Sequence, residues 1–359
     1  MAIEDLLAAI GVIINGLPQG LLALTFGFAS VPTAAGFIVG AIGCGLLGVV
    51  SPISFQAETI TLVGTMGRTI QEKLSMVFWE GSILLIIGFM GVFGKIVDFI
   101  GPVITNAMMA GVGIILARVA VDMTRRNPLI GGISIASALL TYYITPNPAN
   151  KLVFTIVISV AAATIACILA KQQTTLSYDE SREKFIFQKP IINANVIRGT
   201  LGIVTLNIGA NIAFGNITAQ TIAKTDVNLD YLTIISSLAD MTSSLFGGGP
   251  VQAIISATGA APHPLLAGVL MMGLMAVILL AKLLPRIGKY VPNESIAGFL
   301  LVLGAIVTVP INATIALKSG VGTPDTVIGG VTMVVTAITD PFVGMASGLV
   351  VKFLIGIFG

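Results

Sequence analysis

Charged side chains are scarce in this sequence. Of its 359 residues only 9% are Asp, Glu, Lys or Arg, while 55% are hydrophobic and the mean hydropathy is +1.02. A soluble domain carries about 25% charged residues, so a chain of this composition cannot cover its surface with polar groups. The sequence predicts a multi-pass integral membrane protein of the cell (inner) membrane. With a net charge of +2 it offers no basic face to nucleic acid.

Histidine and cysteine are almost absent. There is one histidine, and the two cysteines, Cys44 and Cys167, fall in separate apolar runs where they behave as small buried hydrophobes. Three such residues cannot build a metal site of ordinary spacing, so no metal or other cofactor is expected. No nucleophile–base pair is visible either, and we do not expect an enzyme.

Long apolar runs are what the sequence has instead. A bilayer core of about 30 Å needs roughly 20 apolar residues per helix. With that window the predicted spans are 6–29, 32–50, 75–93, 102–121, 128–144, 151–171, 196–215, 232–246, 264–283, 293–309, 326–339 and 341–357. Two shorter apolar pieces, 59–67 and 252–260, follow the stretches VVSPISFQAE and LFGGGPVQ. Each piece crosses only together with its extended stretch, which gives about fourteen crossings in an all-α chain.

The two halves of the sequence resemble each other. FQA (55–57) and VQA (251–253) match at an offset of 196, and 101–121 matches 291–311 in pattern at an offset of 190. We expect a first repeat over 1–171, a polar connecting loop over 172–195 and a second repeat over 196–359. Seven spans per half is an odd number, so the second half enters the membrane from the opposite side. A 7+7 inverted repeat with paired interrupted helices is typical of secondary transporters with a midplane site.

Four stretches carry a family resemblance: AIGCGLLGVVSPISFQAETI, GPVITNAMMAGVGIILARVAV, LADMTSSLFGGGPVQAIISATGAAPHPLLAG and VPNESIAGFLLVLGAIVTVP. They resemble the nucleobase–ascorbate transporters (xanthine/uracil permeases), and within them the hypoxanthine/guanine/adenine permease branch. The resemblance implies core and gate domains drawn from both repeats, and short strands in the third and tenth spans that cross near the substrate. It also implies a homodimer and termini in the cytoplasm.

The resemblance also shows departures. Family members usually carry acids in the eighth span and often one in the tenth, where this chain has Asn207, Asn211 and Gln252. Glu58 is the only acid beside either interrupted stretch. An unpaired carboxylate at membrane depth is a functional hypothesis by default, and burial favours its neutral form, so Glu58 is the predicted proton-coupling residue. The alternative is a protonated structural acid bonded to backbone freed by the break.

Amide side chains are the predicted substrate contacts. Gln56 and Gln252 occupy equivalent repeat positions, and an amide offers donors and an acceptor to a heterocycle or an amide-like solute. Asn207 and Asn211 lie one helical turn apart on one face. The alternatives are capping of loose backbone for the glutamines and interhelical hydrogen bonding for the asparagines. The predicted contacts also include two further residues of the interrupted stretches, Phe55 and Gly249. Glu80 is expected at the membrane interface, and Asp240 at an interface or a cap.

The predicted function is a proton symporter that moves a small neutral solute, a purine nucleobase first, by alternating access. Its partners would be the solute, protons and the lipid bilayer. An anion or small carboxylate transporter of the same fold is the second hypothesis, and a channel or non-transporting membrane subunit is the third. Paired half-helix N-termini would favour an anion, whereas an ionised Glu58 would repel one.

Orientation is the point where charge and resemblance disagree. Of the 18 Lys and Arg residues, thirteen fall on the side opposite the N-terminus and five on the N-terminal side. Cytoplasmic loops carry the excess of Lys and Arg, so this count predicts both termini outside. Either the orientation is inverted relative to the family or a span near the N-terminus is miscounted.

Overall fold

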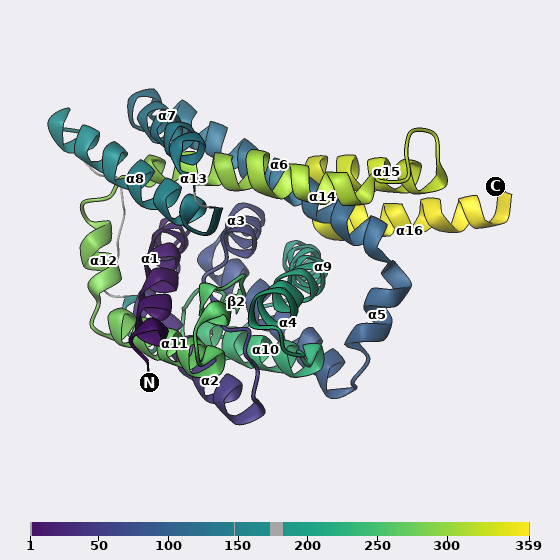
Figure 1. Ribbon diagram of the computed structural model, residues 1–359, viewed down its shortest axis with the longest axis horizontal. Helices are drawn as coiled ribbons and strands as arrows, with labels where there is room; N and C mark the ends of the chain where they lie inside the picture. The colour runs from purple at the N-terminus through teal and green to yellow at the C-terminus, as the bar shows by residue number, and fades with distance from the viewer. Residues whose placement is uncertain (1, 147, 173–181, 359) are drawn as a thin grey trace.

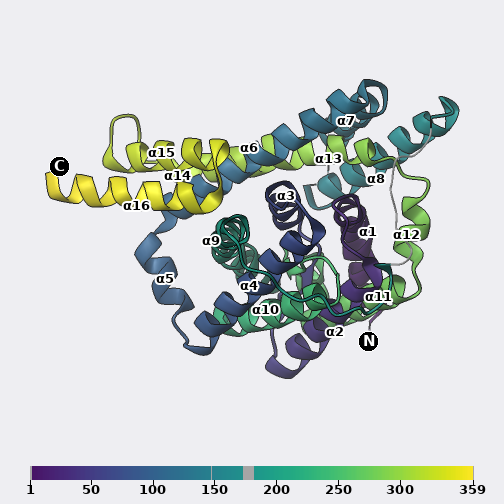
Figure 2. The ribbon, with the colours of Figure 1, turned by 180° about the vertical axis from the view of Figure 1, so that it is seen from behind.

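The computed structural model describes residues 2–146, 148–172 and 182–358, and these form two helical bundles that lie side by side (Figures 1 and 2). The core bundle holds α1 to α4 and α9 to α11. The gate bundle holds α6 to α8 and α13 to α16. Helices α5 and α12 join them at opposite ends. Each bundle therefore draws helices from both halves of the sequence, as expected for core and gate domains.

The core bundle is built of seven α-helices, two strands and two short helical segments in the described residues. They are α1 (Ile3–Thr25), α2 (Ser30–Leu47), β1 (Ile53–Ser54), α3 (Ala57–Met66), α4 (Ile70–Phe89), α9 (Ala194–Asn216), the π-helix η2 (Ile217–Ala223), α10 (Leu229–Leu245), β2 (Gln252–Ala253), the 3₁₀ turn η3 (Ala257–Ala260) and α11 (Pro264–Leu280). Helix α2 packs on α10 and α11, and α10 packs on α4.

The gate bundle is arranged around the long helix α6. Its elements are α6 (Pro102–Arg126), α7 (Pro128–Ile144), α8 (Pro148–Leu169), η4 (Asn293–Ile296), α13 (Ala297–Leu301), the π-helix η5 (Val302–Thr308), α14 (Val309–Ala316), α15 (Pro324–Ile338) and α16 (Pro341–Phe358). The connecting helices are α5 (Phe93–Ile100) and α12 (Leu283–Gly288). The bundles touch where α1 meets α8 and where α9 meets α16 and α6.

The predicted spans correspond to helices with ends that differ by a few residues. Within the described chain seven helices are long and apolar enough to cross a membrane, or eight if α4 and α5, bent by 102°, count as one span. Three shorter apolar helices (α7, α11 and α15) add to these. The all-helical membrane fold is therefore confirmed, and the count of fourteen crossings is supported only roughly.

The two interrupted stretches meet inside the core bundle. Strands β1 and β2 pair antiparallel, with Ile53 opposite Ala253 and Ser54 opposite Gln252. Helix α2 passes close to both: a Cβ on Gly40 would lie 2.6 Å from the Ile53 side chain, and one on Gly36 would lie 2.8 Å from that of Val251. The predicted short extended stretches are thus confirmed, and they form one crossing point.

The helices that follow the strands differ in length. Helix α3 has ten residues, whereas η3 is a 3₁₀ turn of four. The expected short helix over 252–260 is therefore wrong, and with it the expectation of two half-helix N-termini aimed at one point. The sequence ATGAAPHP explains the difference, because Gly259 disfavours helix and Pro262 and Pro264 lack the backbone donors that would extend it.

A reciprocal glycine contact relates the two halves of the gate bundle. A Cβ on Gly113 of α6 would lie 2.9 Å from the Gly304 carbonyl oxygen, and one on Gly304 of η5 would lie 2.4 Å from that of Gly113. Contacts of this self-complementary kind sit on two-fold axes. The two residues are 191 positions apart, close to the 190 offset in the sequence. This supports the inverted repeat, while the boundaries 1–171, 172–195 and 196–359 stay predictions.

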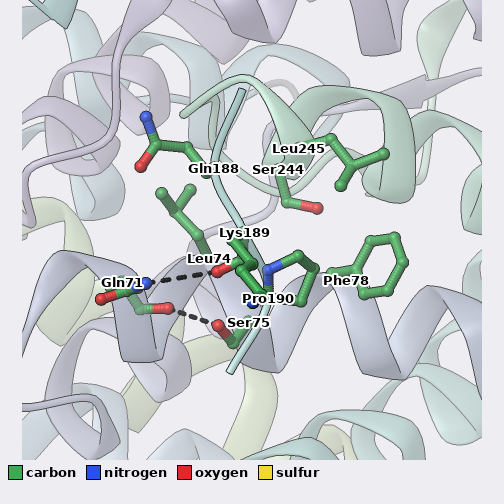
Figure 3. A pocket seen from close by; sticks show the side chains of 9 residues that line it. All are labelled: Gln71, Leu74, Ser75, Phe78, Gln188, Lys189, Pro190, Ser244 and Leu245. Carbon is green, nitrogen blue, oxygen red and sulfur yellow. Dashed lines mark hydrogen bonds between the residues drawn. The ribbon is translucent and has the colours of Figure 1, made fainter. Parts of the chain in front are cut away.

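Part of the predicted connecting loop is an ordered strap over 182–193, and residues 173–181 lie outside the described ones. The strap runs along α4 beside a shallow pocket lined by both segments (Figure 3). The Gln71 amide donates to the Lys189 carbonyl (3.2 Å), and the Trp79 indole donates to that of Ile191 (3.1 Å). The carboxylate of Glu183 accepts from the N–H of Ser30 and the N–H of Val31, which caps α2.

Candidate functional site

Four fully buried polar side chains form a network within the core bundle. They come from four elements: Glu80 from α4, Asn207 from α9, Asp240 from α10 and Gln252 from β2. The Asn207 amide donates to Glu80 Oε1 at 2.7 Å, and the Gln252 amide donates to the same oxygen at 3.3 Å. The Gln252 amide also donates to Asp240 Oδ2. One glutamine thus joins two carboxyl groups.

The network continues through Thr59 to the first interrupted stretch, which holds Gln56. Its hydroxyl lies within hydrogen-bond distance of Gln56 Oε1 and, at 3.0 Å, of Asn207 Oδ1. The Gln56 amide donates to the Ala253 carbonyl at 3.3 Å. The structure therefore brings together Gln56, Asn207 and Gln252, which are up to 196 positions apart. Their contact with a substrate stays a prediction.

Helix α9 separates this network from the gate bundle. Asn207 faces α4, and Gly209, two residues further on, lies against Met108 of α6, because residues two apart point to opposite sides of a helix. A Cβ on Gly209 would lie 2.9 Å from the end of the Met108 side chain. A change in the network can therefore reach the bundle interface through one helix.

Four predicted site residues lie apart from the network. Glu58, in the first turn of α3, is buried, and in the described chain no hydrogen bond joins it to the network. Asn211 donates to the Thr233 hydroxyl at 3.4 Å. Phe55 packs edge-on against Phe37, with ring centroids 5.3 Å apart. Gly249 donates its N–H to the Thr33 hydroxyl. Phe55 and Gly249 therefore have visible packing roles, and the substrate roles of these residues and the coupling role of Glu58 stay predictions.

Glu80 is the main residue that sequence reasoning missed. The expected span over 75–93 placed it near a membrane surface, but α4 begins at Ile70. With ten residues before it, Glu80 lies about 15 Å along the helix, close to the middle of a bilayer core. The signal in the sequence was an acid inside an apolar run, SMVFWEGSILL. The interfacial assignment of Glu80 is wrong.

Asp240 was expected at an interface or a cap, but it lies inside α10 and caps no helix. Its Oδ1 accepts from the Val251 N–H at 2.6 Å and so fixes the residue before β2. The interface position is wrong, because the side chain is fully buried. The hydrogen bond with Val251 ties a carboxyl group to one of the two interrupted stretches.

Several buried oxygens in and around the network lack a hydrogen-bond partner in the described residues. They are Glu80 Oε2, Gln252 Oε1, Asn211 Oδ1 and the hydroxyl of Ser54. A buried polar atom without a partner costs free energy, and native proteins leave few of them. No Lys or Arg among the described residues bonds to Glu80, Asp240, Asn207 or Gln252. The site therefore has spare acceptors that suit a donor, either a proton or an N–H or O–H group of a ligand.

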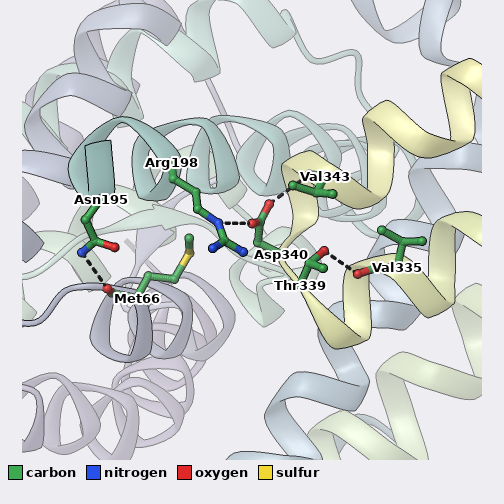
Figure 4. Close-up of polar contacts among 7 residues, drawn as sticks. All are labelled: Met66, Asn195, Arg198, Val335, Thr339, Asp340 and Val343. Carbon is green, nitrogen blue, oxygen red and sulfur yellow. Dashed lines mark hydrogen bonds and ion pairs between the residues drawn. The ribbon is translucent and has the colours of Figure 1, made fainter. Parts of the chain in front are cut away.

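An ion pair links the two bundles near one end of α9. Arg198 Nε of the core bundle lies 2.8 Å from Asp340 Oδ2 at the turn between α15 and α16, and Asp340 Oδ1 accepts from the Val343 N–H (Figure 4). Asp340 is fully buried, and the Arg198 side chain is 55% exposed. This contact ties the start of α9 to the gate bundle.

No family model and no curated protein matches this sequence. Solved structures do match. The murine Solute Carrier 26 family member A9 (Slc26a9) anion transporter in the inward-facing state has a TM-score of 0.71 at 16% identity over 99% of this chain and 68% of its own. A second structure of SLC26A9 gives 0.71 at 16% identity over 99% and 65%. The transmembrane domain of the cyanobacterial bicarbonate transporter BicA gives 0.73 at 13% identity over 97% and 96%.

At these identities the likeness shows the fold. The chain has the inverted-repeat membrane fold of the SLC26A9 and BicA transmembrane domains, which nucleobase transporters share, and it spans about two thirds of the SLC26A9 chains. The resemblance found in the sequence is thus confirmed at the level of the fold. The hypoxanthine/guanine/adenine branch stays a prediction.

Proposed function

We propose that this protein is a secondary active transporter that carries a small anion, inorganic or carboxylate, together with protons. The observation that carries the proposal is the β1–β2 crossing, where two interrupted segments meet in a buried layer beside a polar network. Non-helical backbone at membrane depth is tolerated only inside protein or beside a cavity, and paired breaks mark transport sites. In this proposal the core bundle moves against the gate bundle and exposes the crossing to each side in turn.

Two features support an anion as cargo. The solved neighbours are described as an anion transporter and a bicarbonate transporter. Helix α3 also begins at Ala57, directly beside the crossing, and a helix N-terminus favours negative charge. The buried carboxyl groups would repel an anion if all were ionised. An anion therefore enters together with protons, which makes the predicted proton coupling part of the anion mechanism.

A neutral heterocycle is the second candidate. The unpartnered carbonyl oxygens of Gln252 and Asn211 are suited to the N–H groups of a nucleobase, and no Lys or Arg in the described network would neutralise an anion. The prediction that purine is the first substrate therefore becomes the alternative to an anion.

The test is a thermal-shift screen of the purified protein, followed by counterflow in proteoliposomes. Chloride, bicarbonate, sulfate, small carboxylates and nucleobases are compared at acidic and neutral pH. We expect an anion to stabilise the protein and to exchange with its own label, with the larger effect at acidic pH. Stabilisation by purines alone would select the second candidate. Conductance without saturable exchange would show a channel.

A further inference from the structure

We propose that the Glu80–Asp240 pair is the site of the coupling proton, with the proton bound to Glu80 Oε2. This assignment rests on the proposed transport function and gives Glu58 no coupling role. Both carboxyl groups are fully buried and share one donor, the amide of Gln252. Two carboxylates in such a place cannot both be ionised, because nothing offsets the desolvation of a second charge.

The hydrogen bonds show which member of the pair is ionised. Both oxygens of Asp240 accept hydrogen bonds, one from the Val251 N–H at 2.6 Å and one from the Gln252 amide. Glu80 differs: Oε1 accepts two amide donors, and Oε2 has no partner. A buried carboxylate needs donors at both oxygens to offset its charge, whereas a neutral carboxyl group with one unpartnered oxygen costs much less. Asp240 is therefore the carboxylate and Glu80 the acid.

A second unpartnered oxygen points to the same ligand. Gln252 Oε1 belongs to the amide that bonds to both carboxyl groups, and it is buried without a partner. This spare acceptor lies on the residue that joins the two carboxyl groups, and it suits a proton-bearing group. A metal cation is disfavoured, because the amide donors of Asn207 and Gln252 are directed at Glu80.

Other ionisable groups lie too far along their helices to serve the pair. Glu72 is eight residues before Glu80 on α4, about 12 Å, and Asp230 is ten residues before Asp240 on α10, about 15 Å. The groups on these helices and on the elements packed against them are Glu72, Lys73, Asp230, Tyr231, Glu58 on α3, Cys44 on α2, Arg198 on α9, and Lys95 and Asp98 on α5. In the described part of the chain none of them bonds to Glu80 or Asp240.

The pair is connected to the parts that must move. Loss of the proton from Glu80 places two carboxylates around one amide, and their repulsion acts on Gln252, which belongs to β2. The same charge acts on Asn207, which lies on the helix between the network and the gate bundle. Proton loss therefore destabilises the arrangement seen here and favours one in which Glu80 reaches water. Bound solute and bound proton stabilise the same arrangement, which couples them.

The experiment compares Glu80→Gln, Asp240→Asn and Glu58→Gln in proteoliposomes, with the exposed Asp98→Asn as control. One proton per solute gives about tenfold accumulation per unit of pH gradient, since a unit of pH is a factor of ten in proton activity. We expect Glu80→Gln to abolish this accumulation and to retain counterflow, because glutamine resembles the protonated acid. Asp240→Asn is expected to weaken the pH dependence, and Asp98→Asn to leave it unchanged.

An infrared measurement tests the proton site without any solute. The carbonyl band of protonated carboxyl groups is recorded across a pH titration of the purified protein. We expect Glu80→Gln to remove one such band, and Asp98→Asn to remove none. Retained pH-driven accumulation or an unchanged band in Glu80→Gln would overturn the site, and loss of coupling in Glu58→Gln alone would return the proton to Glu58. Failure of wild-type protein to exchange any solute would instead contradict the proposed function.

Discussion

The two interrupted stretches each contribute one strand to the β1–β2 pair, but their glutamines make different contacts. In the first stretch Gln56 donates to a backbone carbonyl, that of Ala253, and the ten-residue helix α3 follows. In the second stretch Gln252 donates to two carboxyl groups, and only a 3₁₀ turn follows. The first interrupted stretch therefore supplies a helix N-terminus, and the second supplies the hydrogen bonds to ionisable groups.

This difference shows how a repeat can divide its work. Both halves contribute a two-residue strand and a glutamine, but Gln252 lies in β2 whereas Gln56 follows β1 and precedes α3. The surroundings then decide the role: Gln252 meets acids on α4 and α10, and Gln56 meets Thr59 of its own helix. Equivalent positions of the two halves therefore differ both in local backbone and in the side chains that surround them.

The largest expected effect separates the two glutamines directly. Gln252→Leu removes the donor shared by two buried carboxyl groups, so we expect a loss of about 3 kcal/mol in the free energy of unfolding. Gln56→Leu removes only neutral hydrogen bonds, and we expect a loss of about 1 kcal/mol. Denaturant unfolding in detergent measures both. Equal losses would mean that the two amides have the same structural role.

A smaller difference in stability is expected between alanine variants of the two α2 glycines that pack on the interrupted stretches. A Cβ on Gly36 meets the Ala239 carbonyl oxygen at 3.0 Å as well as Val251, and this backbone cannot move aside cheaply. We expect Gly36→Ala to cost about 2 kcal/mol as overpacking. Gly40→Ala meets the flexible side chains of Ile53 and Met272, and its higher helix propensity offsets about 1 kcal/mol of strain. Thermal unfolding of both variants checks the order.

Each interrupted stretch is also held by one side-chain hydrogen bond to its backbone. We expect removal of either bond to act only on its own stretch. Gln19 Oε1 of α1 accepts from the Ala57 N–H at the start of α3, and the Thr218 hydroxyl of η2 accepts from the Ser256 N–H before η3. We expect Gln19→Leu and Thr218→Val each to cost about 1 kcal/mol, as lost caps do. Hydrogen exchange should quicken in α3 for the first and in η3 for the second. Faster exchange in both α3 and η3 for either variant would show that the two interrupted stretches open as one cooperative unit.

The substitutions with the smallest expected effect on the protein test its orientation in the membrane. Lys184 and Lys224 are exposed and lie before and after the candidate membrane span formed by α9 and η2. Cys44 and Cys167 are buried, so new cysteines at 184 and 224 can be labelled selectively. From the Lys and Arg count we expect an impermeant reagent on intact cells to label Lys224→Cys and not Lys184→Cys. The reverse result would place both termini in the cytoplasm, as the family resemblance implies.

The sequence predicted the fold well because apolar length and broken helices are local signals. Runs of about 20 apolar residues locate most spans. The proline and glycines near residues 51–58 and 247–251 locate the crossing. The second short helix could not be predicted from hydropathy, because Gly259 and two prolines end it without changing its apolar character. Helix ends were also uncertain by a few residues.

The site was predicted only in part for a related reason. Gln56, Asn207 and Gln252 stand out as polar residues in apolar surroundings, and the structure joins them. Glu80 was assigned to an interface because an error of five residues in one helix start moves a side chain by about 7.5 Å along the membrane normal. The pairing of Glu80 with Asp240 depends on contact between α4 and α10, which no pattern in the sequence encodes.

The central claim is that the core bundle moves against the gate bundle to carry a solute. The contact between Arg198 and Asp340 offers a direct test, because it joins the two bundles at α9 and α16. Cysteines at both positions are linked with a reducible bifunctional reagent in proteoliposomes, and each single cysteine variant serves as the control. The account predicts that the link stops counterflow, leaves solute binding by thermal shift intact, and is reversed by reduction. Undiminished counterflow in the linked protein would contradict it.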